Sequence, residues 1–405
     1  MNRKTSSPST RTRKSAQKNS NSAAEKLVIQ LMGIPGASGD EVAVADVIRN
    51  KLIDAGAKPS QIKHDTAHKK TPIDGEIGNL IFKLSGTAKG PRRLLMAHMD
   101  TVPICVGCKP KKSGRIVRSS ISTTGLGADN RAGCAVVLNA AMHVLKSDTP
   151  HPPLTFLFTV QEEIGLHGAR HVRKSMLGSP KLCFNWDGGS PSKLTIGATG
   201  GYRMLIEISG LASHAGNAPE RGVSAIAIAS LAIADLHRNG WHGQVEKNGK
   251  SGTTNVGVIN GGAATNVVTD HVTLRAEARS HDPVFRKRIV KEIEKAFQSA
   301  VKEVRSEQGK RGKVTFQGRL DYEAFRMDRT HPTVETAAAA VKAVGGKPQF
   351  AITNGGLDAN WMSVHGLPTV SMGCGQKNQH MVTEELHLDE YLQACEIGRR
   401  LAMAE

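Results

Sequence analysis

Apolar positions along the chain switch between helical and extended spacing from residue 23 onward. The intervals from Leu27 to Leu31 and from Ile48 to Leu52 predict two amphipathic helices on either side of a turn at residues 34–40. Continuous apolar runs predict buried strands at residues 79–84, 93–98, 154–160 and 181–186. An alanine-rich segment predicts a helix at residues 130–146. Buried strands that alternate with helices predict an α/β fold whose mostly parallel sheet is covered by helices on both faces.

The pattern changes over residues 202–322. Here a strand, a helix, two strands, a second helix and a last strand are predicted, at 202–211, 221–238, 254–260, 271–280, 284–307 and 313–322. This β-α-β-β-α-β order is that of a ferredoxin-like α+β domain. After residue 322 the alternation of helices and buried strands returns. We therefore predict one α/β domain formed by residues 23–201 and 323–405, with an inserted domain at 202–322.

Charge is unevenly distributed. The chain has 54 Lys and Arg against 36 Asp and Glu, a formal charge of +18. Six of the positive charges and no acid fall in residues 1–24, which contain almost no apolar side chain. Such a segment cannot bury enough apolar surface to offset its ordering entropy, so residues 1–22 are predicted to be a disordered basic tail.

Several protein classes are excluded or disfavoured by composition. No apolar run approaches the ~20 residues that span a bilayer, and the tail lacks the apolar region of a secretory signal. Six cysteines in 405 residues do not form a disulfide framework. Cys105 and Cys108 form one CxxC, for which reduced thiols are the favoured interpretation and a redox role the alternative. We expect a cytoplasmic protein that does not enter membranes.

Acidic and imidazole side chains follow the ends of five predicted elements. They are His98 and Asp100, Asp129, Glu162 and Glu163, Asp187, and His380. Open α/β sheets bind ligands beyond the carboxyl ends of their strands. A single carboxylate there is explained by helix capping, but five such positions are not. Imidazole nitrogen and carboxylate oxygen are ligands for divalent zinc, so the pattern indicates a metal site.

The segments HMDTVP, GADNRAG, QEEIGLHGAR, NWDGG, SHAGNAPERGVSAI and GGAATNVV, followed by the late His380, occur in one characteristic order. With them the chain resembles, from residue 23 on, the co-catalytic zinc metallopeptidases. This family includes peptidase T (a tripeptide aminopeptidase), carboxypeptidase G, aminoacylase and succinyl-diaminopimelate desuccinylase. The resemblance is greatest to peptidase T-like proteins, and it implies a zinc-exopeptidase fold with an inserted lid domain.

The resemblance implies a site with two divalent metal ions. His98 and Asp187 would bind one ion, Glu163 and His380 the other, and Asp129 would bridge them. Zinc is the expected metal, with Co²⁺ or Mn²⁺ as alternatives, because ligand types alone do not fix its identity.

Roles in catalysis and substrate binding follow from the same resemblance. Asp100 would orient His98, and Glu162 would act as the general base. His214 would stabilise the tetrahedral oxyanion, often from the partner subunit of a homodimer formed through the inserted domain. The positions that would hold the substrate are Asn266 and Arg279, for its carboxylate, and the backbone at Gly355 and Gly356, which is equally explained as a simple turn.

Three functions are compatible with these sequence features. The leading hypothesis is dinuclear metal-dependent hydrolysis of amide bonds in short peptides by an aminopeptidase-like enzyme. The second is a deacylase or carboxypeptidase acting on N-acyl amino acids, because specificity depends on pocket shape rather than on the fold. The third, a basic nucleic-acid-binding protein with a vestigial metal site, is disfavoured because every implied ligand is present and the tail has no aromatic residue.

Overall fold

The computed structural model describes residues 10–403. The chain forms two compact units, the first comprising Met1–Ile196, Met327–Ala351 and Leu357–Glu405, and the second Gly197–Arg326 and Ile352–Gly356. The second unit contains the insert that we placed at residues 202–322, extends beyond it at both ends, and includes a short segment from the later part of the chain. That segment contains Gly355 and Gly356, two of the predicted substrate-binding positions.

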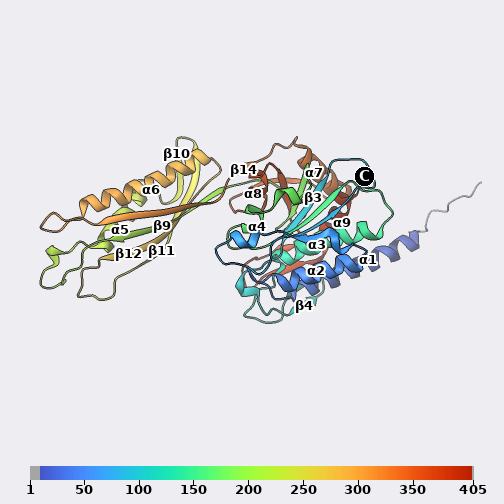
Figure 1. Ribbon diagram of the computed structural model, residues 1–405, viewed down its shortest axis with the longest axis horizontal. Coiled ribbons are helices and arrows are strands. Elements are labelled where there is room, and N and C mark those ends of the chain that lie inside the picture. Colours follow the sequence, from blue (N-terminus) through green and yellow to red (C-terminus); the bar gives the residue numbers. More distant parts are fainter. Residues whose placement is uncertain (1–9, 404–405) are drawn as a thin grey trace, which may run out of the picture. The chain divides into compact units, whose positions relative to one another are not determined.

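A nine-stranded mixed sheet organises the first unit within the described part of the chain (Figure 1). Its order is β1-β2-β6-β3-β7-β16-β8-β14, and β15 also pairs with β8. The bounds are β1 Ile62–His64, β2 Leu80–Leu84, β3 Arg93–His98, β6 Leu154–Thr159, β7 Leu182–Trp186, β8 Lys193–Ala198, β14 Phe325–Arg326, β15 Gln349–Thr353 and β16 Thr369–Met372. Strand β3 pairs in parallel with both β6 and β7, and β7 in parallel with β16. The pairs β1–β2, β2–β6, β8–β14 and β8–β16 are antiparallel.

Helices flank this sheet, and the predicted fold class is confirmed. The helices are α1 Thr10–Met32, α2 Val42–Asp54, α3 Ala128–Lys146, α4 His167–Arg170, α7 Pro332–Ala343, α8 Ala359–Val364 and α9 Leu388–Ala402. Short 3₁₀ turns occur at Pro59–Gln61, Ala67–Lys70, Pro103–Cys105 and Lys174–Met176. Helix α3 packs against β3 and β7 and also against α9, and almost all of its residues are buried. Strand β6 is buried over its whole length, as expected for a parallel strand covered on both faces.

Helix α1 corrects part of the predicted disordered tail. The prediction covered residues 1–22; residues 1–9 lie outside the described residues, but from Thr10 the chain is helical. The C-terminal half of α1 is anchored, because Ala24, Val28 and Leu31 are buried and Ser20 Oγ accepts a hydrogen bond from Arg399 at 3.2 Å. A packed segment overcomes helix nucleation, after which extension towards the N-terminus is inexpensive. No helix in residues 10–403 combines the length and apolarity that a membrane span requires.

A small second sheet of the first unit holds the segment that contains His380. Its order is β17-β18-β5-β4, with bounds β4 Pro110–Ser113, β5 Ile116–Ser119, β17 Gln376–Lys377 and β18 Glu385–His387. Strand β18 pairs with β5, and the loop between β17 and β18 carries His380. The hairpin of β4 and β5 therefore fixes one end of a loop more than 250 residues later in the sequence.

The second unit has the predicted ferredoxin-like order with one additional strand. Its sheet runs β10-β11-β12-β9-β13, with bounds β9 Gly200–Ser209, β10 Gly243–Lys247, β11 Lys250–Gly261, β12 His271–Ser280 and β13 Lys313–Tyr322. Helices α5 Ala225–Arg238 and α6 Pro283–Glu303, with a 3₁₀ turn at Pro219–Arg221, complete the unit (Figure 1). Both helices share one apolar core with alternate residues of β9 and β12, including Ile206, Ile208 and Leu274. The opposite face of the sheet carries polar residues.

Candidate metal centre

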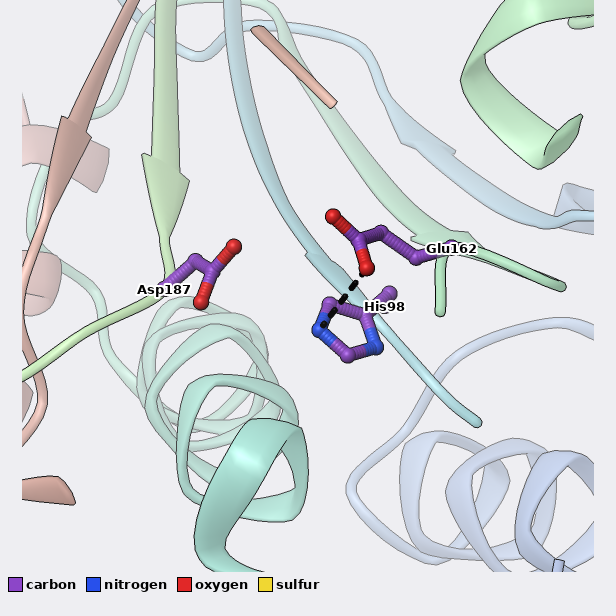
Figure 2. Close-up of side chains that lie close together, drawn as sticks. All are labelled: His98, Glu162 and Asp187. Atoms are coloured by element: carbon purple, nitrogen blue, oxygen red, sulfur yellow. Dashed lines mark ion pairs between the residues drawn. The ribbon is translucent and has the colours of Figure 1, made fainter. Parts of the chain in front are cut away.

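Three strands deliver acidic and imidazole side chains to one edge of the central sheet. His98 is the last residue of β3, Glu162 follows β6, and Asp187 comes directly after β7. Because β3 is parallel to both neighbours, these three strand ends lie side by side. Figure 2 shows the three side chains converging on a common space from three different strands.

The ligand atoms form two overlapping groups. One ring nitrogen of His98 and one carboxylate oxygen each of Glu162 and Asp187 lie within 4.8 Å of one another, and so do those of His98, Asp129 and Glu163. His98 Nε2 is 3.9 Å from Glu162 Oε2. Glu162, predicted as the base, thus lies within the same group of candidate ligand atoms as His98 and Asp187.

Asp129 lies between the two histidines. Its Oδ1 is 3.3 Å from His98 Nε2, and its Oδ2 is 3.5 Å from His380 Nε2. His380 Nε2 is also 3.0 Å from Glu163 Oε2. The structure therefore brings together all five residues predicted as metal ligands, with Asp129 in the position that a bridging carboxylate would occupy. Its non-helical backbone at the start of α3 directs it there rather than along the helix.

Asp100 fastens two strand ends to each other. The Nδ1 of His98 faces the Asp100 carbonyl at 3.1 Å and Asp100 Oδ1 at 3.3 Å, so this nitrogen carries the proton and leaves Nε2 free towards the cluster. Asp100 also accepts hydrogen bonds from the backbone N–H of Glu162 at 3.0 Å and of Glu163 at 3.1 Å. One carboxylate thus orients the imidazole and positions the Glu-Glu pair, which is the arrangement that the predicted role of Asp100 requires.

Crowding of like charges shifts the ionisation of the cluster. Burial, reinforced by Asp129 and Glu163, raises the pKa of Asp187 to about 8. Burial also raises the pKa of Glu162 well above its ordinary value. Hydrogen bonds that His380 donates to the carboxylates of Asp129 and Glu163 raise the pKa of His380 to about 10. The site therefore holds protons at neutral pH in places where cations would be electrostatically favoured.

The residues present fit a pair of divalent cations. Glu163 Oε1 is buried and has no hydrogen-bond partner in the described part of the chain, and Asp129 Oδ1 has only its ion-pair contact with His98. Buried carboxylate oxygens in this condition are expensive unless a cation coordinates them. The donor set of imidazole nitrogen and carboxylate oxygen, with a carboxylate placed between two histidines, suits zinc.

Two groups of predicted substrate residues lie in the second unit. His214 and Asn266 are on adjacent exposed loops, where Ala215 N donates to Asn266 O at 2.9 Å and His214 forms a β-bridge with Val267. His214 Nδ1 accepts from the backbone N–H of Gly216 and Asn217 at 3.1 and 3.2 Å.

Arg279 lies in the other group. Its guanidinium forms two hydrogen bonds with Glu277, at 2.9 and 3.0 Å, and donates to Asn354 O at 3.2 Å, beside Gly355 and Gly356. A Cβ on Gly356 would lie 2.6 Å from the Tyr322 ring, so glycine is required there, whereas Gly355 has room for a side chain. The structure thus brings His214 to Asn266, and Arg279 to Gly355 and Gly356.

Comparison with known proteins assigns the chain to a family. The model of peptidase family M20/M25/M40 matches residues 94–404, most of the chain. The chain belongs to this peptidase family. It is also 30% identical to the protein YqjE of Bacillus subtilis (strain 168) over 370 residues, 91% of this chain and 94% of that one. Carboxypeptidase G2 of Pseudomonas sp. (strain RS-16) is 29% identical over 343 residues, 80% of this chain and 75% of that one.

Two similar solved structures are peptidases by name. Aminopeptidase PepT from Bacillus cereus ATCC 10987 is similar with a TM-score of 0.82 and 30% identity, covering 94% of this chain and 98% of that chain. A tripeptidase from Staphylococcus aureus subsp. aureus mu50 gives a TM-score of 0.85 and 29% identity, with 94% and 97% covered. The predicted family and its enzyme character are confirmed.

One buried carboxylate that we did not predict holds two segments of the candidate metal centre together. Glu384, 1% exposed, accepts hydrogen bonds from the backbone N–H of Leu126 at 2.8 Å, Gly127 at 2.6 Å and Asp129 at 2.9 Å. It lies four residues after His380 and so connects the loop that carries His380 to the segment that carries Asp129. Nothing in the sequence distinguishes it from the neighbouring Glu385.

Two further carboxylates behind the site were missed. Glu41 accepts hydrogen bonds from the backbone N–H of Gly39 and Gln161, both at 2.9 Å, and so holds the residue that precedes Glu162. Asp358 accepts a 2.5 Å hydrogen bond from Thr159 Oγ1, next to His98 across the β3–β6 pair. Acids that follow glycine-containing turns at SGDE and GGLD were the only available signal.

The CxxC pair shows no sign of redox reactivity. Cys105 and Cys108 are buried and free, and burial raises the pKa of the Cys108 thiol to about 11 and that of Cys105 further. Reactive thiols have lowered pKa values. Cys105 instead donates to Glu384 at 3.4 Å, and Cys108 donates to the carbonyls of Met32 and Leu126. Both act as small buried donors.

We expect Glu384→Gln to weaken zinc binding by about tenfold, the lower end of the range for outer residues that orient metal ligands. The amide would place a donor NH₂ against backbone N–H groups that now meet oxygen, and Asp129 would lose its fixed position. Zinc affinity is measured by competition with a chromophoric chelator. Glu385→Gln is the matched control, because Glu385 pairs with Arg118 and His387 near the surface. Equal zinc affinity in folded wild-type and Glu384→Gln protein would contradict the assignment.

Proposed function

We propose that this M20 protein is a dinuclear metal-dependent exopeptidase that hydrolyses amide bonds in short peptides. The observation that carries the proposal is the convergence of His98, Glu162 and Asp187 with Asp129 and Glu163 in two overlapping ligand groups. The two groups share His98, and Asp129 directs one carboxylate oxygen towards His98 and the other towards His380, as a carboxylate shared by two ions would. The similarity to an aminopeptidase and a tripeptidase over nearly the whole chain supports peptides as substrates.

The ligand assignment uses one residue from each converging segment. His98 and Asp187 would hold one ion, Glu163 and His380 the other, and Asp129 would bridge the two. Divalent ions bound there would polarise the scissile carbonyl and lower the pKa of a water molecule. Zinc is the metal we propose from the nitrogen and oxygen donors, with Co²⁺ and Mn²⁺ as alternatives.

Proton transfer is assigned to Glu162. Its carboxylate lies within one of the ligand groups, its backbone N–H donates to Asp100, and burial raises its pKa. A base of this kind takes a proton from the attacking water and gives it to the leaving amine. Asp100 keeps the imidazole of His98 in the tautomer whose Nε2 faces the cluster.

Substrate binding is assigned to the second unit. The His214 ring accepts two backbone hydrogen bonds at Nδ1, so its Nε2 carries the proton and is available to donate to an oxyanion. Arg279 suits a terminal carboxylate because its planar fork already holds the Glu277 carboxylate in two hydrogen bonds. Asn266 and the backbone at Gly355 and Gly356 complete this set.

We further propose that two copies form a homodimer that shares these residues. Asn266 precedes the start of β12 and Arg279 lies near its end; a ten-residue strand spans about 30 Å. An extended tripeptide reaches only about 10 Å. A short peptide that meets His214 and Asn266 as well as Arg279 must therefore take them from different copies. Six free, buried cysteines support a cytoplasmic location.

A second function is favoured by one relative. Carboxypeptidase G2 is similar over 80% of this chain, and a carboxylate-binding arginine serves a carboxypeptidase or an N-acyl amino acid deacylase equally well.

We expect the zinc-loaded protein to hydrolyse di- and tripeptides with a free amino terminus. The panel includes the same peptides with blocked amino or carboxyl termini, and N-acetyl and N-succinyl amino acids, with released amine measured. Turnover only of substrates that have a free carboxyl terminus and a blocked amino terminus would favour the carboxypeptidase or deacylase instead. Turnover of none, with zinc bound, would refute amide hydrolysis of these classes.

We expect Glu162→Gln to reduce kcat by at least about a hundredfold, the lower end for loss of a general base, while two zinc ions still bind. The amide cannot accept the proton, but its size is retained. Released amine and bound zinc are measured on the same preparation, with Glu335→Gln on the exposed side of α7 as the control. Undiminished kcat would disprove the role of Glu162 as base, and loss of zinc would show that Glu162 is a ligand.

We expect mixed dimers of two inactive variants to regain activity. A Glu162→Gln chain supplies an intact His214, and a His214→Ala chain supplies an intact Glu162, so a mixed isologous dimer contains one complete site. Statistical mixing gives about one quarter of wild-type activity. The subunits are mixed, re-equilibrated and assayed, and their mass is measured by light scattering. A monomeric mass, or a mixed dimer without activity, would rule out the shared site.

A further inference from the structure

The open face of the second unit's sheet contains a hollow that no role above uses. Its volume is about 740 Å³, and it lies over β11, β12, β9 and β13. Helices α5 and α6 pack on the opposite face of the same sheet, against Met204, Ile206 and Leu274. The hollow is therefore floored by a rigid sheet and belongs entirely to this unit.

Strand register determines which side chains line the hollow. In one row, Val258, Arg275 and Leu205 are cross-strand neighbours, and Gln317 follows Leu205. In the next row, Asn255, Glu277, Arg203 and Arg319 are neighbours in that order. A β-bulge between Val256 and Val258 places a glycine, Gly257, on β11 between the two rows, which widens the space there.

Positive charge dominates this lining. Arg203, Arg275 and Arg319 face one acid, Glu277, and that carboxylate is already held by Arg279. Arg203 and Arg319 share the buried Asp321 at 2.5 and 3.1 Å. Arg275 is exposed and has no ion pair or hydrogen bond to any described residue. The nearest row beyond it carries Glu207, whose carboxylate accepts a long 3.5 Å hydrogen bond from Thr315.

The geometry points to a binding site for short acidic peptides on this face. Four strands at a spacing of about 4.8 Å give a hollow roughly 14 Å wide, the length of about four extended residues. Acidic side chains would pair with Arg275 and with the outward sides of Arg203 and Arg319, and apolar side chains would contact Leu205 and Val258. Arginine forks bind carboxylates with two parallel hydrogen bonds, which favours acidic over neutral peptides. This site goes beyond the proposed hydrolysis and is independent of it.

The test measures binding without turnover. Fluorescein-labelled Gly-Glu-Leu-Glu-Leu amide, blocked at both ends against exopeptidases, is titrated with the full-length protein and followed by anisotropy. The matched probe replaces both Glu residues with Gln. We expect the Gln probe and the Arg275→Ala protein each to lower the affinity by about tenfold, and raised salt to weaken binding of the Glu probe more than that of the equally labelled Gln probe.

Controls separate this surface from general basicity. Arg238→Ala removes an exposed arginine of α5, on the helical side of the unit, and should leave the affinity unchanged. Arg275→Glu should weaken binding of the Glu probe more than Arg275→Ala does. Unchanged far-ultraviolet circular dichroism of each variant verifies folding. Equal affinity for the Glu and Gln probes would overturn the proposal, as would undiminished binding by Arg275→Ala. Binding of a labelled single-stranded oligonucleotide that needs Arg275, without binding of the peptide, would overturn it in favour of nucleic acid.

Discussion

Concentrated negative charge in a buried place is the constraint on which the rest of the first unit depends. Asp100, Asp129, Glu162, Glu163 and Asp187 meet at one sheet edge, where His98 and His380 form ion-pair contacts with them. Two unit charges 4 Å apart interact by about 4 kcal/mol at an effective dielectric constant of 20. Protons relieve this repulsion, as the raised pKa of Asp187 and Glu162 indicates, and divalent cations would relieve it further. A scaffold that merely tolerated these residues would let them turn away from each other.

The scaffold holds the carboxylates in place against their mutual repulsion. It gives some of them backbone N–H donors and leaves others without such donors. Asp100, Glu384 and Glu41 each accept at least two backbone N–H groups, and each of them fixes a loop. Glu163 Oε1 is buried without a hydrogen-bond partner among residues 10–403, while its Oε2 faces His380. The same chemical group therefore serves two purposes, and the number of N–H donors aimed at it decides which. Parallel pairing of β3 with β6 and β7 sets the distance between the loops that these carboxylates hold.

Pattern and position explain what could be predicted from the sequence. Buried strands and the α3 helix have strong, local apolar signals, and the rule that ligands gather at strand ends led to His98, Glu162 and Asp187. The charged β4–β5 hairpin and the additional strand β10 lack such signals, because their stability comes from pairing with strands elsewhere. The N-terminal half of α1 is polar and depends on the packed half for its helicity. Glu384 could not be distinguished from Glu385, since its importance lies in contacts with residues more than 250 positions earlier.

Separation of chemistry from selection follows from the two-unit arrangement of the chain. Under the proposed function, the cluster of carboxylates and imidazoles would supply the chemistry of amide hydrolysis, which does not by itself select one end of a peptide. Recognition therefore requires charges elsewhere, and the second unit offers Arg279 in a pair with Glu277. A substrate carboxylate must compete with Glu277 for this guanidinium, so a neutral or weakly oriented ligand gains little there. Under the proposed function, small changes around this pair would alter which peptide terminus is accepted while the metal ligands stay the same, and relatives named aminopeptidase and carboxypeptidase share one fold.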